Sequence, residues 1–484
     1  MLVKDNFPSI SGMYLINGEW ISSSHVKPVI NPANIKEVVG EIALCSQDDV
    51  NQAVEAASSA FQTWSQTTIE ERSNLMLAVA SKLEKIISEN ISLFVRENGK
   101  TLIEAKKDLG RCVEIMKKGP DLLKEWWQVQ DFSNEHQKVQ IRKRPRGVTA
   151  IIAPWNSPMI LTFKRLVPAL LTGNTVVFKP ATDCPLTVMN CLKEVAACFP
   201  QGVINIVTGS GRVIGDTICS HPKVKAVAFV GSTETGKEII KNCAPTVKKL
   251  SLELGGNDPA LVLQDAKLDD EAIRNMRGAV LRAAGQVCSA VKRIYVHQSR
   301  YEEFVTKLEK DFHRIVVGNG LHPDTTMGPI NNKSQFDFVN DLKNKTIQEG
   351  ANVVNCGRKL DDESWENGYF MLPSFVTGVK QTSDIVQLEQ FGPIVPILPF
   401  SDTEEAIHLA NDTEFGLRAS VWTEDESLAI KLADRIQAGA VFHNNHTIFK
   451  DLRLDFPGLK ESGLSTETIY GGLEFFTDSY GFAN

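Results

Sequence analysis

The chain has 484 residues, 42% of them hydrophobic and 23% charged, and its 59 acidic and 52 basic residues give a net charge of −7. This length exceeds what one hydrophobic core usually holds, so it predicts two or three domains of an ordinary globular protein. The acidic balance argues against a broad nucleic-acid-binding surface, and no run of residues has the length and apolar character of a membrane span.

The first third of the chain is typical of scaffold. Its start lacks the apolar core of a signal peptide, and the nine cysteines of the chain include no Cys-x-x-Cys pair, so we expect reduced thiols in a cytoplasmic protein. Tyr14–Trp20 alternates and turns at Asn17-Gly18, which predicts a hairpin. Apolar spacings of three and four from residue 48 to about 118 predict helices. Five basic residues in 138–146 fit an extended strand with solvated charges better than a nucleic-acid site.

The remaining chain alternates strands with helical stretches. Strands are expected near 148–153, 174–178, 203–207 and 224–230, and strand–helix repetition predicts a parallel sheet with helices on both faces. A second α/β unit is expected to contain strands at 260–263 and 293–297, a helix over about 269–284, and a strand–loop–strand between 371 and 400. The predicted fold is therefore α/β with two doubly wound parallel-sheet domains.

Several polar or glycine-rich segments follow these strands, where open α/β sheets bind ligands. Pro154-Trp155-Asn156 places a short amide there, although Asn156 by itself fits a turn. Gly211 and Gly215 lie in a turn that departs from the Gly-x-Gly-x-x-Gly fingerprint and is weak evidence for a dinucleotide. Gly231-Ser232 precedes a helix start, which suits a pyrophosphate, and an ordinary N-cap is the alternative.

Glu253 and Cys288 carry the strongest chemical signal. Glu253 lies in Glu-Leu-Gly-Gly, and Cys288 ends Gly-Gln-Val-Cys. A carboxylate in a Gly-Gly turn and a cysteine after a glycine suggest a general base and a thiol nucleophile, as acyl transfer through a thioester requires. Taken alone, a buried cysteine is usually a small inert hydrophobe.

These two boxes, in this order and together with Pro154-Trp-Asn156 and Glu389-Gln-Phe391-Gly-Pro, resemble the aldehyde dehydrogenase superfamily of the hydrolytic type. The resemblance covers essentially the whole chain. It implies that Cys288 attacks the aldehyde, that the Asn156 side chain and the Cys288 N–H hold the oxyanion, and that Glu253 activates the water that hydrolyses the thioester. Glu253 also favours a free carboxylic acid over acyl transfer to coenzyme A.

The resemblance also implies NAD or NADP as cofactor. Lys179 would contact the adenosine ribose, Glu389 the nicotinamide ribose and Phe391 the nicotinamide ring. The other expected cofactor-binding residues are Trp155, Thr182, Gly211, Gly215, Gly231 and Ser232. Many NAD-preferring members carry Glu where this chain has Thr182. Removing a carboxylate removes repulsion of a 2′-phosphate without creating affinity for it, so both cofactors stay open.

The substrate prediction rests on Lys164, which stands at a pocket-lining position of several members. A cation there would pair with a substrate carboxylate, which suggests an ω-semialdehyde such as succinate semialdehyde. The alternatives are a neutral aliphatic or aromatic aldehyde with Lys164 facing solvent, or an inactive scaffold. Arg165 matches a basic position near the cofactor. The Cys288 thiolate needs help from Glu253, from Lys164 or Arg165, or from the cofactor, and the sequence does not say which.

The resemblance further implies a cofactor-binding domain (1–133 and 149–252, with 444–465), a catalytic domain (253–443) and an oligomerisation arm (134–148 and 466–484). The arm implies a homodimer or homotetramer, and a hairpin-like segment is expected from Gly472 to Tyr480.

His443 and His446 lack a third ligand nearby, so no metal is expected. Asp455-Phe-Pro-Gly departs from the usual Pro-Phe-Gly-Gly and could reshape the substrate entrance.

Overall fold

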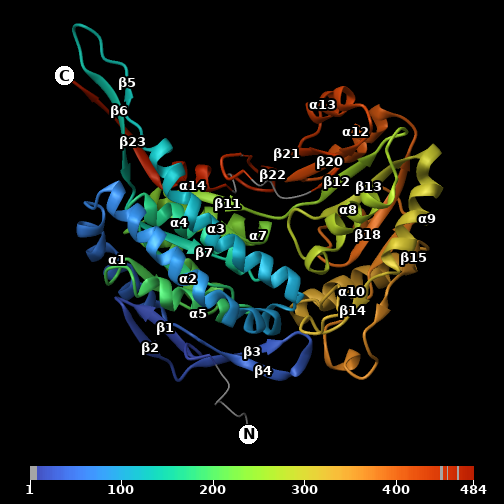
Figure 1. Ribbon diagram of the computed structural model, residues 1–484, viewed down its shortest axis with the longest axis horizontal. Coiled ribbons are helices and arrows are strands. Elements are labelled where there is room, and N and C mark those ends of the chain that lie inside the picture. The colour runs from blue at the N-terminus through green and yellow to red at the C-terminus, as the bar shows by residue number, and fades with distance from the viewer. Residues whose placement is uncertain (1–7, 447–450, 455, 466–467) are drawn as a thin grey trace.

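The computed structural model describes residues 8–446, 451–454, 456–465 and 468–484. Asp455 of the departing segment, the first seven residues and residues 466–467 of the predicted arm lie outside the described residues. Two large sheets with their helices form the body, and a narrow β arm extends from one of them (Figure 1).

The first sheet has the strand order β11-β10-β7-β8-β9-β1-β2 within the described residues. Its strands are β1 (Met13–Ile16), β2 (Glu19–Ser22), β7 (Val148–Ile152), β8 (Thr175–Lys179), β9 (Ile204–Ile206), β10 (Val224–Val230) and β11 (Lys249–Glu253). Strands β7 to β11 are parallel, and β1 and β2 add the expected hairpin antiparallel at one edge. The predicted strands in 148–230 are confirmed to within two residues.

Helices cover both faces of this sheet because successive side chains of a strand point to opposite sides. Ala150 and Ile152 of β7 pack under one helix layer, and Ile151 packs under the other. The first layer contains α1 (Gln47–Trp64), α6 (Asp216–Ser220) and α7 (Thr233–Cys243), and the second contains α2 (Ile69–Asn98), α3 (Leu102–Trp126), α4 (Pro158–Leu171) and α5 (Leu186–Ala196). Among the described residues, no helix is both long enough and apolar enough to span a bilayer.

The helical prediction for 48–118 corresponds to three helices. The breaks between them follow from capping boxes, in which a hydroxyl and a carboxylate three residues later satisfy the first N–H groups. Ser46, Thr68 and Thr101 cap α1, α2 and α3 in this way.

The second sheet has the order β15-β17-β18-β13-β12-β20-β21. Its strands are β12 (Asp258–Val262), β13 (Val291–His297), β15 (Asn352–Asn355), β17 (Ser374–Thr377), β18 (Ile394–Phe400), β20 (Arg418–Trp422) and β21 (Ala440–His443), all parallel to their neighbours except β15. One face packs against α8 (Asp270–Leu281) and α9 (Tyr301–Phe312), the other against α10 (Lys333–Gln348), α11 (Asp384–Gln387), α12 (Thr403–Asn411) and α13 (Glu426–Ala433). The α/β class with two parallel sheets is confirmed.

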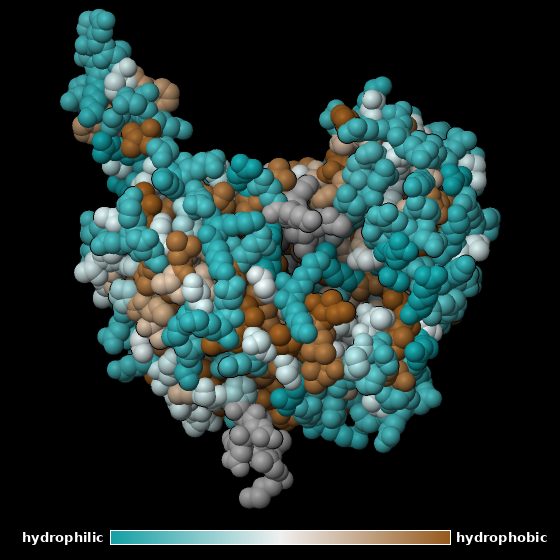
Figure 2. Space-filling view, in the orientation of Figure 1, coloured by the Kyte–Doolittle hydropathy of each residue, from teal (hydrophilic) through white to brown (hydrophobic). Residues whose placement is uncertain are grey.

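The arm consists of β5 (Gln130–Asp131), β6 (Val139–Pro145) and β23 (Thr477–Ala483), and its surface is largely hydrophilic (Figure 2). The prediction of a hairpin-like segment from Gly472 to Tyr480 was wrong. That segment begins inside α14 (Ile469–Phe475) and continues into β23, which pairs antiparallel with β6 of the same chain.

Three further pairs of strands lie outside the two large sheets and the arm in the described chain. They are β3 (Val26–Asn31) with β4 (Asn34–Ala43), β14 (Val316–Val317) with β16 (Arg358–Lys359), and β19 (Phe415–Gly416) with β22 (Leu459–Lys460).

Gly328 marks a close contact between the two halves of the body. A Cβ at Gly328 would lie 1.8 Å from the carbonyl oxygen of Gly99, at the end of α2. We therefore expect Gly328→Ala to lower the free energy of unfolding by about 1–3 kcal/mol, measured by urea unfolding. Gly278→Ala is the control, because Gly278 is exposed on α8 with nothing within 4 Å of its added Cβ. It should raise stability by about 0.5–1 kcal/mol, and equal midpoints for the two variants would contradict the assigned contact.

Candidate functional site

The carboxyl ends of β7, β8, β10 and β11 bring most of the singled-out residues to one edge of the first sheet. Asn156 follows β7, Lys179 ends β8, Ser232 follows β10 and Glu253 ends β11. The carboxyl ends of parallel strands share one edge, where open α/β sheets bind ligands. The second sheet contributes the other residues from the loops before β13 and β18.

The chain passes from the first sheet to the second through residues 254–257, between β11 and β12. A Cβ at Gly255 would lie 2.6 Å from Glu389 Oε2, and a Cβ at Gly256 would lie 2.6 Å from the Cys288 carbonyl oxygen. The Gly256 N–H donates to Glu389 Oε1 at 3.0 Å. Both positions therefore require glycine, because atoms of the second half of the molecule approach their backbone closely. This approach places the strand that ends at Glu253 beside the segment between α8 and β13 (residues 282–290), here called the Cys288 loop.

The Cys288 loop follows α8 through an unusual backbone. Ala283 and Ala284 have φ of 51° and 55°, and Gly285 follows at 74°. Left-handed non-glycine residues cost energy and persist only where the surroundings fix them. The buried Gln286 supplies part of that support, because its Nε2 donates to the Ala283 carbonyl (2.9 Å) and its Oε1 accepts the Asn331 N–H (2.9 Å). Cys288 itself is half-buried.

The Asn156 side chain reaches the same loop. It is 6% exposed, and its Nδ2 donates to the Gln286 carbonyl at 2.9 Å. An amide nitrogen carries two N–H groups, so this bond fixes the side chain and leaves one donor over. Asn156 and Cys288 are thus brought together from different sheets.

Glu253 is held by a buried ion pair. Its Oε2 lies 2.8 Å from the Arg165 guanidinium, and the two side chains are 6% and 7% exposed. Arg165 also donates to the Leu161 carbonyl one turn earlier in α4. Lys164, the preceding residue of α4, is buried as well, at 9% exposure, so the alternative of a solvent-facing Lys164 is wrong.

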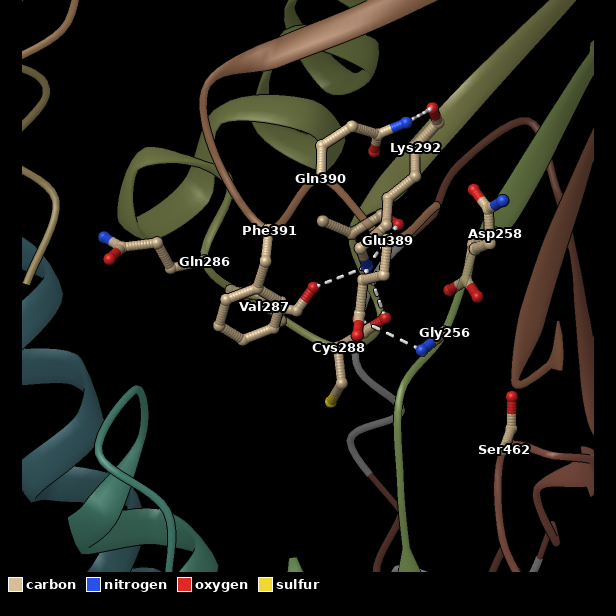
Figure 3. A network of polar contacts seen from close by, with 12 residues as sticks. Gly256, Asp258, Gln286, Val287, Cys288, Lys292, Glu389, Gln390, Phe391 and Ser462 are labelled. Carbon is tan, nitrogen blue, oxygen red and sulfur yellow. Dashed lines mark hydrogen bonds and ion pairs between the residues drawn. The ribbon is translucent and has the colours of Figure 1, made fainter. Parts of the chain in front are cut away.

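Glu389 and Phe391 approach the Cys288 loop from the segment before β18 (Figure 3). Lys292 Nζ lies 3.4 Å from Glu389 Oε1. Burial raises the pKa of Glu389 above its usual range, and the Lys292 charge opposes that rise. Phe391 has φ of 49°, and its ring meets Trp155 edge-on with centroids 5.5 Å apart. Residues expected to line one cofactor pocket are therefore adjacent here.

The other expected cofactor-binding residues differ in how well their surroundings explain them. Lys179 is 6% exposed, its one hydrogen bond to a described residue is a long 3.4 Å contact to the Pro180 carbonyl, and burial lowers its pKa to about 8. Ser232 caps α7 by accepting the Thr235 N–H. A Cβ at Gly231 would lie 2.3 Å from the Phe229 ring, so packing alone requires this glycine.

Gly211 and Gly215 follow β9, and Thr182 follows β8, so all three come after the carboxyl ends of strands of the first sheet. Gly211 and Gly215 bound the single turn η2, and a Cβ at either would meet nothing within 4 Å. Thr182 is half-buried after β8. Neither glycine is required by contacts within the described chain.

Arg282 is a functional candidate that the sequence reasoning missed. It follows α8, is half-buried, and lies within electrostatic reach of Cys288, Asp108 and Glu104. Burial lowers its pKa, and the neighbouring Arg418 lowers it further. No hydrogen bond or ion pair joins its guanidinium to any residue that the structure describes. The available signal was its spacing of six residues before Cys288, in the same segment.

The two histidines have separate partners. His443 Nε2 contacts the Thr423 carbonyl oxygen at 2.9 Å, whereas His446 Nε2 lies 3.3 Å from Asp258 Oδ2, with both side chains fully buried. Burial lowers the pKa of His446 despite that carboxylate. Asn444 has φ of 54° and joins β20 and β21 through hydrogen bonds to Thr423.

Comparisons with known proteins agree with one another. The model of the aldehyde dehydrogenase family matches residues 20–480. An α-ketoglutaric semialdehyde dehydrogenase of Bacillus subtilis is 36% identical over 471 residues, 96% of each chain. An NADP(+) succinate-semialdehyde dehydrogenase of Escherichia coli is 33% identical over 477 residues, again 96% of each chain. The crystal structure of a betaine aldehyde dehydrogenase from Staphylococcus aureus in complex with NAD+ superposes with a TM-score of 0.93 at 32% identity, covering 98% of this chain and 95% of the other.

Thiol exposure gives a direct test of the loop. Cys198 and Cys288 are half-buried, whereas the other seven cysteines are buried. We expect a disulfide reagent to titrate two thiols rapidly in the native protein and all nine after denaturation. Cys288→Ser and Cys198→Ser should each remove one rapid equivalent. Rapid reaction of a third thiol, or the same count in either variant, would contradict the burial described.

Proposed function

The chain belongs to the aldehyde dehydrogenase family, and we propose that it oxidises an aldehyde bearing a carboxylate, an ω-semialdehyde such as succinate semialdehyde, to the corresponding acid with NAD or NADP. The observation that carries the substrate class is Arg282, a half-buried guanidinium that forms no hydrogen bond or ion pair with a described residue and lies within electrostatic reach of Cys288. A charge removed from water is costly unless it is paired, so such a cation suits an anionic ligand.

The described residues fit the cofactor. Lys179 is a buried ammonium with one long hydrogen bond, and it would hold the adenosine ribose or a 2′-phosphate. The first turn of α7 offers N–H groups to a pyrophosphate beyond the Ser232 cap. Glu389 would bind the nicotinamide ribose, with Phe391 and Trp155 beside the ring. Thr182 carries no charge to repel a 2′-phosphate, so the chain accommodates either cofactor.

Cys288 is the proposed nucleophile. Its thiolate adds to the aldehyde carbon, and the carbonyl oxygen becomes an oxyanion that accepts hydrogen bonds from the Asn156 amide and the Cys288 N–H. The Asn156 bond to the Gln286 carbonyl supports this role, because it holds the amide against the loop with one N–H left over. When bound, the cofactor would supply a hydride acceptor, and loss of a hydride from the thiohemiacetal carbon leaves a thioester.

Glu253 is the proposed base for hydrolysis of that thioester. It takes a proton from water as the water attacks, and the acid leaves as Cys288 regains its thiolate. The Arg165 pair at 2.8 Å favours the ionised carboxylate, which is the form that accepts a proton. During turnover the Glu253 carboxylate would therefore bind both the Arg165 guanidinium and the attacking water.

Substrate selection is assigned to Arg282, with Lys164 as a second cation from α4. A guanidinium binds a carboxylate through two parallel hydrogen bonds, which gives orientation as well as affinity. The names of two similar proteins, the α-ketoglutaric and succinate semialdehyde dehydrogenases, support this class. We further propose a cytoplasmic homodimer or homotetramer, in which the outer edge of β23 in the arm pairs with a second copy.

The roles of Cys288 and Glu253 can be separated by pre-steady-state kinetics. We expect Glu253→Gln to release about one equivalent of reduced cofactor per subunit and then to turn over about 100- to 1,000-fold more slowly than wild type, because the thioester forms but is not hydrolysed. Cys288→Ser should show no burst. Both are measured by nicotinamide absorbance in a stopped-flow instrument. Unchanged steady-state turnover of Glu253→Gln would remove Glu253 as the base.

The substrate class is tested by comparing succinate semialdehyde with hexanal, using both NAD and NADP. We expect Arg282→Met to lower kcat/KM for the semialdehyde by about 100-fold relative to hexanal, and Lys164→Ala to lower it by a smaller factor. Arg274→Met is the matched control, because Arg274 is an exposed arginine on α8. Equal losses for the two aldehydes would make Arg282 a structural residue and favour a neutral substrate.

A further inference from the structure

Lys292 is a buried lysine that the proposed chemistry does not yet use. It lies at the start of β13 and is 2% exposed. Its side chain turns back toward the Cys288 loop, where Nζ donates to the carbonyl oxygens of Val287 (2.8 Å) and Cys288 (2.6 Å). Figure 3 shows the ammonium on one side of the loop and the Cys288 sulfur on the other. A buried ammonium on two successive carbonyls fixes both peptide planes.

The first of these planes has a particular consequence. The Val287 carbonyl and the Cys288 N–H belong to one peptide unit, which is planar and trans, so they point in opposite directions. Because Lys292 holds the carbonyl, the Cys288 N–H must point away from the ammonium, toward the side of the thiol. That N–H is one of the two proposed oxyanion donors. Lys292 therefore determines where the donor points.

The charge of Lys292 adds a second effect. A cation bound to a peptide carbonyl draws electron density from the unit and strengthens its N–H as a donor, as in any chain of hydrogen bonds. Val287 also accepts the Ala290 N–H at 3.0 Å, so the carbonyl is bound from two sides. Glu389, 3.4 Å from Nζ, balances the charge and keeps the lysine in place.

Resting on the proposed function, we propose that Lys292 is a positioning residue that orients and polarises the Val287–Cys288 peptide, so that the Cys288 N–H is set as an oxyanion donor before substrate arrives. Preset donors are effective because they need no reorganisation during the reaction. Lys292 touches neither substrate nor thiol in this role and acts through the backbone alone. If Lys292 only filled a buried site, replacing it would slow every reaction of the Cys288 thiol to the same extent, whether or not the reaction passes through an oxyanion.

Two reagents separate these cases without cofactor. The ester p-nitrophenyl acetate acylates a thiolate through a tetrahedral oxyanion, whereas iodoacetamide alkylates the same thiolate by displacement of iodide with no oxyanion. For Lys292→Met we expect acylation about 10- to 100-fold slower than wild type, with alkylation changed by less than about threefold across the pH profile. Lys292→Arg, which keeps a cationic donor, should recover much of the acylation rate. Lys310→Met, an exposed lysine on α9, is the control and should change neither rate.

The outcomes distinguish the two levels of the proposal. Equal losses in acylation and alkylation, or no loss of acylation, in Lys292→Met would overturn the role of Lys292 while Cys288→Ser still abolished both reactions. Acylation that survived in Cys288→Ser would refute the nucleophile itself and the role of Lys292 with it. If Lys292→Met does not fold, Lys292→Gln tests the same point, because its side chain carries no charge and is one bond shorter than that of lysine.

Discussion

The passage of the chain from one sheet to the other is the constraint on which the site depends. Residues 254–257 must leave β11 and enter β12 within four positions, and both glycines in that span lie against polar atoms of the second half of the molecule. No side chain fits at Gly255 or Gly256. The crossing therefore draws the Glu253 strand, the Cys288 loop and Glu389 into one region, and every chemical role assigned to these residues follows from that proximity.

Buried charge is the second organising feature. Arg165 meets Glu253, and Lys292 meets Glu389, so each of these desolvated charges is compensated. Arg293, fully buried on β13, donates hydrogen bonds to the carbonyls of Asn257, Leu409 and Ala410. The bond to Asn257 holds the end of the 254–257 segment. Uncompensated buried charges are costly, and the half-buried Arg282 differs from Arg165, Lys292 and Arg293 in having no hydrogen bond or ion pair with a described residue, although Asp108 and Glu104 act on it from a distance. That difference makes it the most informative residue about substrate.

Much of the fold followed from sequence pattern because its signals are local. The strands near 148–230 and the helix before Cys288 were recognisable from apolar periodicity and from the residues that begin and end them. The segment from Gly472 to Tyr480 was misjudged, because its aromatic residues suit a strand whereas α14 begins at a Thr468 cap that satisfies the first turn. The choice between helix and strand there was made by packing against α3 and α4 and by pairing with β6.

The sequence by itself determined the kinds of groups at the site. A thiol after Gly-Gln, a carboxylate in a Gly-Gly turn and an amide after a buried strand are chemical types in fixed local settings, and local settings are written in order along the chain. Only the tertiary structure decided which charges compensate one another. Arg165 could have paired with many carboxylates, Lys292 had no evident task, and Arg282 resembled any other helix-terminal cation. Electrostatic pairing depends on distance and desolvation between segments far apart in sequence, and these quantities exist only once the two sheets are packed together.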